Sequence, residues 1–131
     1  MIRRYGIDTS ILVRLLTGDP AESFERCVAH LSALSESGEV FASNQVIGEA
    51  YIAVQHHYDV GKADAREGLE TVLKSGLVAP LSGKAVFEAL AKRSGCGLLD
   101  RLITLGYSQQ ELETLTLDQR MASLPGARHL G

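Results

Sequence analysis

Residues 4–16, RYGIDTSILVRLL, place a short strand-like run directly before a longer helix-like run. Residues 4–7 are a predicted strand, and residues 9–16 repeat apolar side chains with a helical period. Asp8 stands at the junction between the two. This order is typical of a βα unit, in which ligand-binding side chains gather outside the carboxyl end of the strand.

The same alternation continues to the end of the chain. Further strands are expected at residues 40–42, 77–79, 113–117 and 128–130. Helices are expected between them, at residues 20–37, 44–60, 63–74 and 82–92 and around Asp100. Strands that alternate with helices predict a parallel sheet, so the expected fold class is α/β. We find no repeat, low-complexity tract or linker, and therefore expect one domain over residues 1–131.

Length and composition are those of one globular domain, with 131 residues of which 45% are apolar. No apolar run approaches the roughly 20 residues of a membrane helix, and the first residues do not follow the signal-peptide pattern. Cys27 and Cys96 form no metal-binding pair, so we expect free thiols, with one disulfide as the alternative. These features favour a cytoplasmic protein that does not contact membranes.

The charge balance is mildly acidic. A net charge of −3 is unusual for a protein that holds nucleic acid by overall charge alone. Nucleic acid is still allowed, because bound metal would neutralise acidic side chains and the nine arginines can form a local patch. The chain has no tryptophan and few aromatic residues, which gives little support to a base-stacking platform.

Four acidic residues interrupt or follow apolar segments: Asp8, Glu49, Asp100 and Asp118. Removing a carboxylate from water costs several kcal/mol or more unless it has a partner. Carboxylates that converge on one pocket are most simply stabilised by a divalent metal, and hard oxygen ligands favour Mg²⁺ or Mn²⁺. The set therefore indicates metal-assisted hydrolysis of a phosphodiester.

Taken one at a time, the acids have simpler explanations. Asp8 and Asp118 each follow a strand, where an aspartate often caps the next helix. Asp100 lies near the start of a helix and can complement the helix dipole. Glu49 is expected on the same helix face as Val46, with no lysine or arginine within one turn. It is much less probable that all four acids have only such simple roles than that any one of them does.

Hydroxyl groups lie close to these acids in the sequence. Ser10 and Thr116 are interpreted as donors that orient the neighbouring carboxylates. Ser43 is either such a donor or the cap of the helix that carries Glu49.

Four stretches each carry one of the acids: residues 7–19 (IDTSILVRLLTGD), 43–49 (SNQVIGE), 99–103 (LDRLI) and 115–120 (LTLDQR). In this order and at this spacing they resemble the motifs of the PIN-domain family, especially its VapC-type toxins from bacterial toxin–antitoxin pairs. The likeness spans nearly the whole chain. No single motif is specific, and the ordered set carries the resemblance.

The resemblance implies a three-layer α/β/α domain that acts as an Mg²⁺- or Mn²⁺-dependent ribonuclease. It also implies a homodimer and inhibition by a cognate antitoxin protein. Ser10 stands where many relatives have asparagine, which keeps a polar donor. Arg101 stands where a small residue is common, so it would either aid phosphate binding or pair with the acids and weaken metal binding. The implied catalytic and metal-binding residues are Asp8, Glu49, Asp100 and Asp118.

The expected activity is endonucleolytic hydrolysis of RNA by a metal-activated water. Glu49 would bind metal or position the water, and candidates for a phosphate clamp are Arg14, Arg101 and Arg120. An antitoxin arginine could enter the acidic pocket, with apolar contacts from the helix faces of Phe24 and Leu31 or of Tyr51 and Val54.

Two alternatives come from other functional classes. A receiver-like phosphoacceptor also binds Mg²⁺ with aspartates at strand ends, but it begins with paired acids and has a later strand-end lysine. Here no acid adjoins Asp8, and Lys84 falls within an expected helix. The second alternative is a catalytically weak or inactive PIN-like binding module, against which the complete acidic set argues.

Overall fold

The structure is a computed structural model that describes residues 2–131. The chain divides into two compact units, of which the first ends at Leu81 and the second runs from Ser82 to Gly131. A single domain over the whole chain stays a prediction. No helix within residues 2–131 has the length and apolar character required to cross a membrane.

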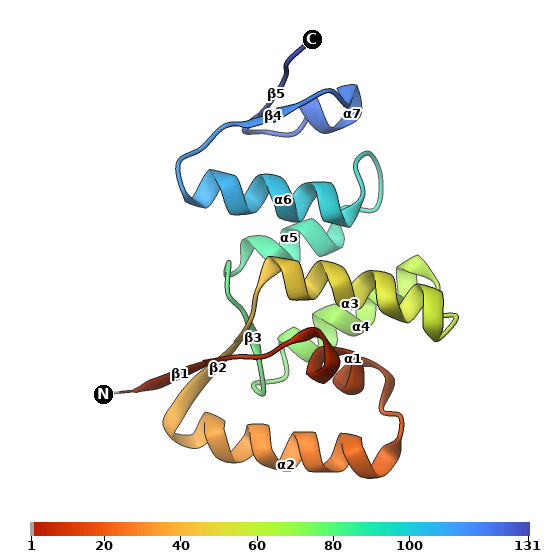
Figure 1. Cartoon of the computed structure of the whole chain (residues 1–131), viewed down its shortest axis with the longest axis vertical. Coiled ribbons are helices and arrows are strands. Elements are labelled where there is room, and N and C mark those ends of the chain that lie inside the picture. Colours follow the sequence, from red (N-terminus) through yellow and green to blue (C-terminus); the bar gives the residue numbers. More distant parts are fainter. Residues whose placement is uncertain (1) are drawn as a thin grey trace. The chain divides into compact units, whose positions relative to one another are not determined.

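The first unit contains three strands and four helices (Figure 1). In chain order they are β1 (Arg3–Gly6), α1 (Thr9–Thr17), α2 (Ala21–Ser37), β2 (Gly38–Ala42), α3 (Asn44–His57), α4 (Lys62–Leu73) and β3 (Ala79–Pro80). The strands form one sheet in the order β1-β2-β3, and both pairings are parallel. Crossover helices connect parallel strands, as a βα architecture requires.

The register between β1 and β2 depends on a glycine. Arg3 pairs with Gly38, and Gly6 pairs with Phe41. A Cβ atom at position 38 would lie 2.6 Å from the carbonyl oxygen of Arg3, which is closer than packed atoms can approach. The pairing continues with the amide of Ile7, which donates to the carbonyl of Phe41 at 2.9 Å. The first strand therefore runs up to Asp8, the first acid.

The core of the first unit lies among α1, α3 and α4, which Figure 1 shows on the same side of the strands. The apolar side chains that contribute most are fully enclosed: Leu12, Ile47, Val54 and Leu69. They come from three different helices, so burial of each depends on the other two. This packing fixes the start of α1 against α3.

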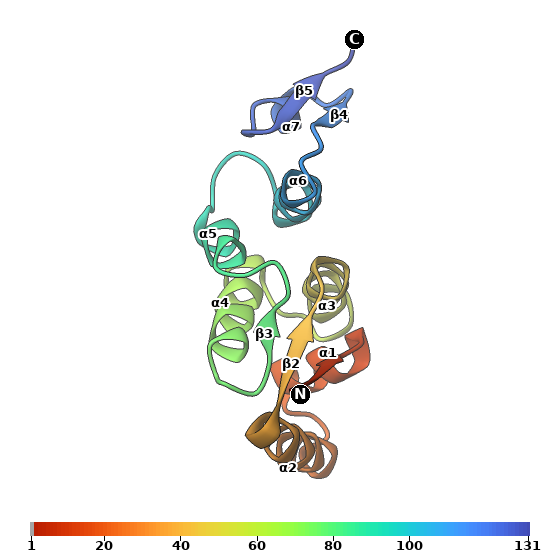
Figure 2. The ribbon, with the colours of Figure 1, turned by 90° about the vertical axis from the view of Figure 1, so that its left-hand side faces the viewer.

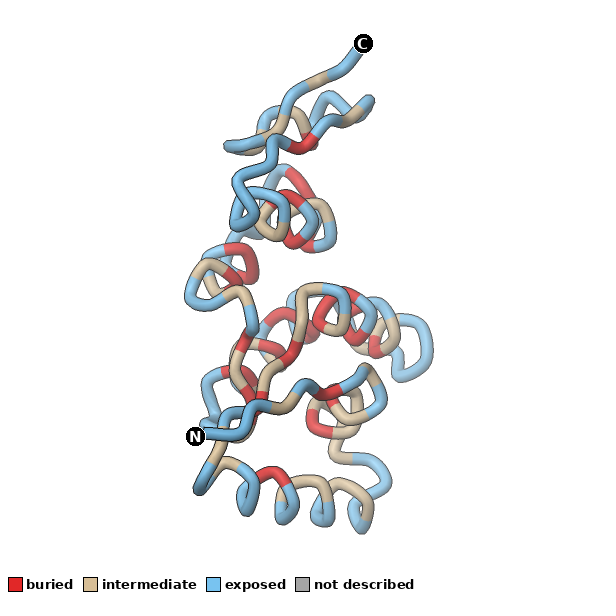
Figure 3. Tube along the Cα trace, turned by 60° about the vertical axis from the view of Figure 1, so that its left-hand side comes forward, coloured by how far each residue is buried: buried red, intermediate tan, exposed pale blue. Residues whose placement is uncertain are grey.

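Helix α2 is less buried than its apolar pattern predicts. Only Leu31 is buried in this helix, Phe24 is half-buried and Leu34 is exposed. Figure 3 accordingly draws most of the helix in the colours for exposed and intermediate residues. Its start also differs from the expectation, because Pro20 rather than Asp19 occupies the N-cap position and provides no side-chain cap. The helical period identified the stripe, but one side of this long helix has few neighbours to cover it.

The second unit contains α5 (Ala85–Ala91), α6 (Leu98–Gln109), β4 (Thr114–Thr116), α7 (Gln119–Ala122) and β5 (Ala127–His129). Strands β4 and β5 form a parallel two-stranded sheet, with α7 between them in sequence (Figure 2). The expected fold class is confirmed, since every strand pairing is parallel and helices connect the strands. Strand β3 is shorter than expected and begins two residues later.

Candidate functional site

Asp8 lies where β1 passes into α1 and caps that helix. One carboxylate oxygen, Oδ1, accepts a hydrogen bond from the Ser10 hydroxyl at 2.5 Å and from the Ile11 amide at 3.3 Å. The Ser10 contact is the largest cause, and the Ile11 amide the second, of a pKa for Asp8 below its ordinary value. The exposed Asp8 side chain is therefore ionised at neutral pH and held in a fixed orientation.

Glu49 lies on α3 and is exposed, which corrects the expectation that it shares a buried helix face. At about 100° per residue it falls on the same stripe as Gln45 and Ile52, and both are exposed. Its Oε1 accepts from the Thr9 hydroxyl at 2.5 Å, and its Oε2 accepts from Gln45 Nε2 at 3.2 Å. These contacts, Thr9 first, lower the pKa of Glu49.

Thr9 connects the first two acidic motifs. It follows Asp8 in the chain and donates to Glu49, so the start of α1 and the middle of α3 are joined by a side-chain hydrogen bond. Within residues 2–131, neither carboxylate forms an ion pair with lysine, arginine or histidine. Both keep their negative charge, and their hard oxygen donors fit Mg²⁺ or Mn²⁺.

The other two acids belong to the second unit. Asp100 is half-buried in the first turn of α6, and Asp118 is exposed and caps α7. Oδ1 of Asp118 accepts from the amides of Arg120 and Met121 at 2.8 and 3.1 Å. A cap uses one carboxylate oxygen, so the other is available to a ligand.

Cys96 lies within the electrostatic reach of both of these acids. Burial is the largest cause of its raised thiol pKa, and the charge of Asp100 is the second; Asp118 adds to the effect. Its Sγ donates to the Arg120 carbonyl at 3.0 Å. Cys96 and Cys27 are both free thiols, as expected. Asp100 and Asp118 are therefore both close enough to the buried Cys96 thiol for their charges to raise its pKa.

The three hydroxyl residues make different contacts. Ser10 donates to the carboxylate of Asp8. Ser43 Oγ accepts from the Val46 amide at 3.1 Å and so caps α3. Thr116 Oγ1 accepts from the backbone amide of Asp118 at 3.0 Å and does not touch its carboxylate. That any of these hydroxyls affects the binding of a metal stays a prediction.

The arginines expected to bind phosphate are held mainly by backbone carbonyls. Arg14 donates to the Asp19 carbonyl at 2.6 Å. Arg101 donates through Nε to the Cys96 carbonyl and through Nη2 to the Ser94 carbonyl, at 3.1 and 2.9 Å. Among the described residues, Arg101 pairs with no acid, and the guanidinium of Arg120 has no partner.

The two donors to Glu49, Thr9 and Gln45, were not predicted from the sequence. Gln45 precedes Glu49 by four positions on one helix, a spacing that places side chains next to each other, so this donor was recognisable. Thr9 gave no local signal, because it meets Glu49 only through packing of α1 on α3.

Each unit contributes two of the four acids, and within residues 2–131 no group of three or more His, Cys, Asp or Glu side chains is arranged to hold a metal ion. The four-carboxylate site stays a prediction. Comparison with protein families matches residues 5–127 to the PIN domain. Comparison with curated proteins finds no match.

Proposed function

Because this chain belongs to the PIN-domain family, whose members are generally nucleases, we propose that it is an Mg²⁺- or Mn²⁺-dependent endoribonuclease. The observation that carries the proposal is the pair Asp8 and Glu49. Both are exposed, free of ion pairs among residues 2–131, and oriented by neighbouring hydroxyls. Carboxylates that stay ionised, exposed and oriented in this way are available to a ligand.

Some of the site residues would bind the metal ions, and others orient the carboxylates. In this proposal Asp8, Asp100 and Asp118 would hold one or two divalent ions, directly or through water, while Glu49 would bind metal or position the attacking water. A bound divalent ion supplies Lewis acidity, which favours a hydroxide nucleophile at neutral pH and offsets charge on the phosphate oxygens. No carboxylate attacks phosphorus. Ser10 and Thr9 keep Asp8 and Glu49 ionised and directed, so less reorganisation is needed when substrate binds.

The proposed substrate is RNA, whose 2′-hydroxyl distinguishes it from DNA. Of the three candidate phosphate ligands, Arg120 has a guanidinium without a partner among the described residues, whereas Arg14 and Arg101 are already oriented by carbonyls. All three can still donate, since an arginine has five N–H groups.

We further propose a biological role as the toxin of a type II toxin–antitoxin pair, acting in the cytoplasm as a homodimer with one PIN domain per chain. The motif resemblance supports this role. An inhibitory antitoxin would place an arginine among the carboxylates and bury apolar surface on α2, where Phe24 is half-buried and Leu34 is exposed. No exposed surface for this contact comes from Leu31 on the same helix or from Tyr51 and Val54 on α3, because these side chains are buried within the first unit.

The decisive experiment is sequencing of RNA 5′ ends after brief expression, with Glu49→Gln as the inactive control. New 5′ ends that appear only with the unsubstituted protein support the nuclease, and in vitro their formation should require Mg²⁺ or Mn²⁺. RNA binding without new ends would instead identify an inactive PIN-like binding module. Growth rescue by the product of a neighbouring open reading frame tests the toxin role separately, and no rescue by any partner removes that role.

A further inference from the structure

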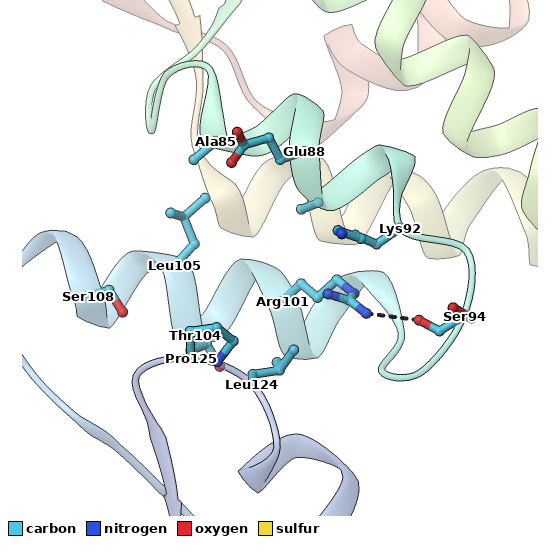
Figure 4. Close-up of a pocket in the computed structure, with 11 residues that line it drawn as sticks. Ala85, Glu88, Lys92, Ser94, Arg101, Thr104, Leu105, Ser108, Leu124 and Pro125 are labelled. Atoms are coloured by element: carbon cyan, nitrogen blue, oxygen red, sulfur yellow. Dashed lines mark hydrogen bonds between the residues drawn. The ribbon is translucent and has the colours of Figure 1, made fainter.

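The second unit contains a cavity of about 520 Å³, within the range of small-molecule sites. It lies between α5, α6 and the turn before β5, and all the residues that line it belong to Ser82–Gly131 (Figure 4). One part of the wall is apolar, with Leu105, Leu124 and Pro125. The other part is charged and polar. A ligand that fits must therefore have both an apolar body and a charged group.

The charged part of the wall favours an anion. Lys92, which directly follows α5, and Arg101 on α6 both line the cavity, and Glu88 is the one acid in its lining (Figure 4). Within residues 2–131, Lys92 forms no ion pair. The second unit has six lysines and arginines against five acids, a net charge of +1, whereas the whole chain carries −3. An anionic ligand therefore finds its complementary charge here.

Arg101 is oriented before any ligand binds. Its Nε and Nη2 donate to the carbonyls of Cys96 and Ser94. The loop approaches closely at Gly95, which has a φ of +78° and where a Cβ atom would lie 3.3 Å from Nη2. The remaining N–H groups are available, and a guanidinium held in a fixed plane recognises phosphate oxygens well.

Three hydroxyl residues lie around the turn at Gly126, which follows the cavity residue Pro125, and the hydroxyls of two of them have no hydrogen-bond partner among the described residues. Thr104 lines the cavity and is only 4% exposed. Its Oγ1 neither accepts nor donates a hydrogen bond among the described residues. The same holds for Oγ1 of the buried Thr114, whose amide donates to the Gly126 carbonyl. A Cβ atom at Gly126 would meet Ser108 Oγ at 2.7 Å and Thr104 Cγ2 at 3.9 Å, so these residues surround one backbone turn. Buried polar groups normally have partners, so a polar ligand group is favoured here.

We propose that this cavity binds one nucleotide of a single-stranded RNA. Lys92 and Arg101 bind its phosphate, Leu105, Leu124 and Pro125 contact the base, and the hydroxyls of Thr104 and Ser108 hydrogen-bond to ribose or base. The inference rests on the proposed function in taking RNA as the substrate, and it adds a place within the second unit where the chain binds that RNA. The lining has no aromatic side chain, so the base is held by apolar contact rather than by ring stacking.

The test uses the full-length protein in EDTA, so that binding is measured without turnover. Fluorescence anisotropy with a labelled five-nucleotide RNA at several salt concentrations compares Lys92→Gln with Lys84→Gln and Arg93→Gln. Both controls remove the same charge from or beside α5 without touching the cavity. Lys92→Gln should weaken binding about fivefold to tenfold and lower the salt slope by about 0.7. Glu88→Gln should strengthen binding. Equal losses in all three lysine and arginine variants would show general attraction and overturn the proposal.

Mononucleotides and inorganic phosphate distinguish a nucleotide site from a simple anion site. Amide NMR shifts should follow mononucleotide binding at Leu105 and Ser108, with phosphate alone at least tenfold weaker. Thr104→Val should reduce mononucleotide affinity about threefold without lowering the unfolding temperature. Phosphate binding as tight as the nucleotide, or displacement of RNA by a hexaglutamate peptide at equal concentration, overturns the nucleotide assignment. If Lys92→Gln binds RNA normally while Glu49→Gln abolishes cleavage, the cavity proposal fails and the nuclease stands. If Lys92→Gln weakens RNA binding while Glu49→Gln still cleaves RNA, the role of Glu49 in the nuclease fails and the cavity proposal stands.

Discussion

The Thr9 hydroxyl donates a hydrogen bond to Glu49 at 2.5 Å, although the two residues are 40 positions apart in the chain. This contact ties the helix that follows Asp8 to the helix that carries the second acid. It is also the largest cause of the lowered pKa of Glu49. A residue outside the four acids thus helps to position one of them and stabilises its ionised form.

Thr9→Val should raise the pKa of Glu49 toward its ordinary value of 4.5, because the hydroxyl stabilises the ionised form. A lowered carboxyl pKa stabilises the fold above the unfolded-state pKa, and this contribution is lost as the pH falls through the folded-state value. The variant should therefore show a weaker dependence of stability on pH below about 4.5. NMR titration of the Glu49 carboxyl carbon measures the shift directly. Gln45→Ala is the matched control and should raise the pKa less; an unchanged pKa in Thr9→Val would contradict the prediction.

Asp8→Asn should lower RNA cleavage by at least about 10–100-fold, the loss typical of damage near a metal site. Asparagine keeps an oxygen that can cap α1, so the fold should be as stable as before, or more stable because repulsion among the acids is relieved. Calorimetry with Mn²⁺ checks the cause, since the affinity should fall with the activity. Asp19→Asn removes an equal charge from an exposed loop and should leave both unchanged. Equal Mn²⁺ affinity in the Asp8 variant and the unsubstituted protein would remove Asp8 from the metal site.

Glu49→Gln should abolish cleavage almost completely while the protein stays folded. The substitution keeps the size of the side chain, and only the charge and one acceptor oxygen are lost. Glu25→Gln, on the exposed face of α2, is the matched control and should cleave RNA normally. The measurement is the rate of cleavage of a verified RNA substrate, with circular dichroism to confirm folding. Retained cleavage would return Glu49 to the role of an ordinary surface acid.

Local patterns predicted the order of strands and helices because hydrophobic period and turn residues act over a few positions. The start of α1 after Asp8 and the start of α3 after Ser43 follow from such signals. Exposure is different, since it depends on which neighbours arrive from elsewhere in the chain. Glu49 was therefore expected on a buried face although it is exposed, and α2 was expected to bury more of its stripe than Leu31.

The candidate site was predictable only in part for the same reason. Aspartates after strands can be recognised from sequence alone, because a strand end and a helix cap are local features. The Thr9 contact to Glu49 arises from packing of two helices and has no sequence signal. The cavity beside Arg101 likewise depends on how α5 and α6 pack.

Ser43→Ala should lower the free energy of unfolding by about 1 kcal/mol, because Ser43 Oγ caps α3 through the Val46 amide. If capping is the sole role of this hydroxyl, the variant should cleave RNA at the normal rate under conditions in which it is fully folded. Urea denaturation and a cleavage assay separate the two effects. Ser43→Asp, which retains a capping oxygen, is the control and should recover most of the stability. A loss of cleavage in the folded alanine variant would give Ser43 an additional role near the acids.

Thr114→Val should leave stability unchanged or raise it by up to about 1 kcal/mol. The Thr114 hydroxyl is buried in β4 without a hydrogen-bond partner among the described residues, so its removal sacrifices no bond and ends the cost of keeping it from water. Valine has nearly the same shape and suits a strand. Urea denaturation of the full chain gives the difference, with Thr116→Val as the control, because Thr116 Oγ1 accepts from the Asp118 amide and its loss should destabilise. A clear loss of stability in Thr114→Val would mean that this hydroxyl has a hydrogen-bond partner in solution and would contradict the prediction.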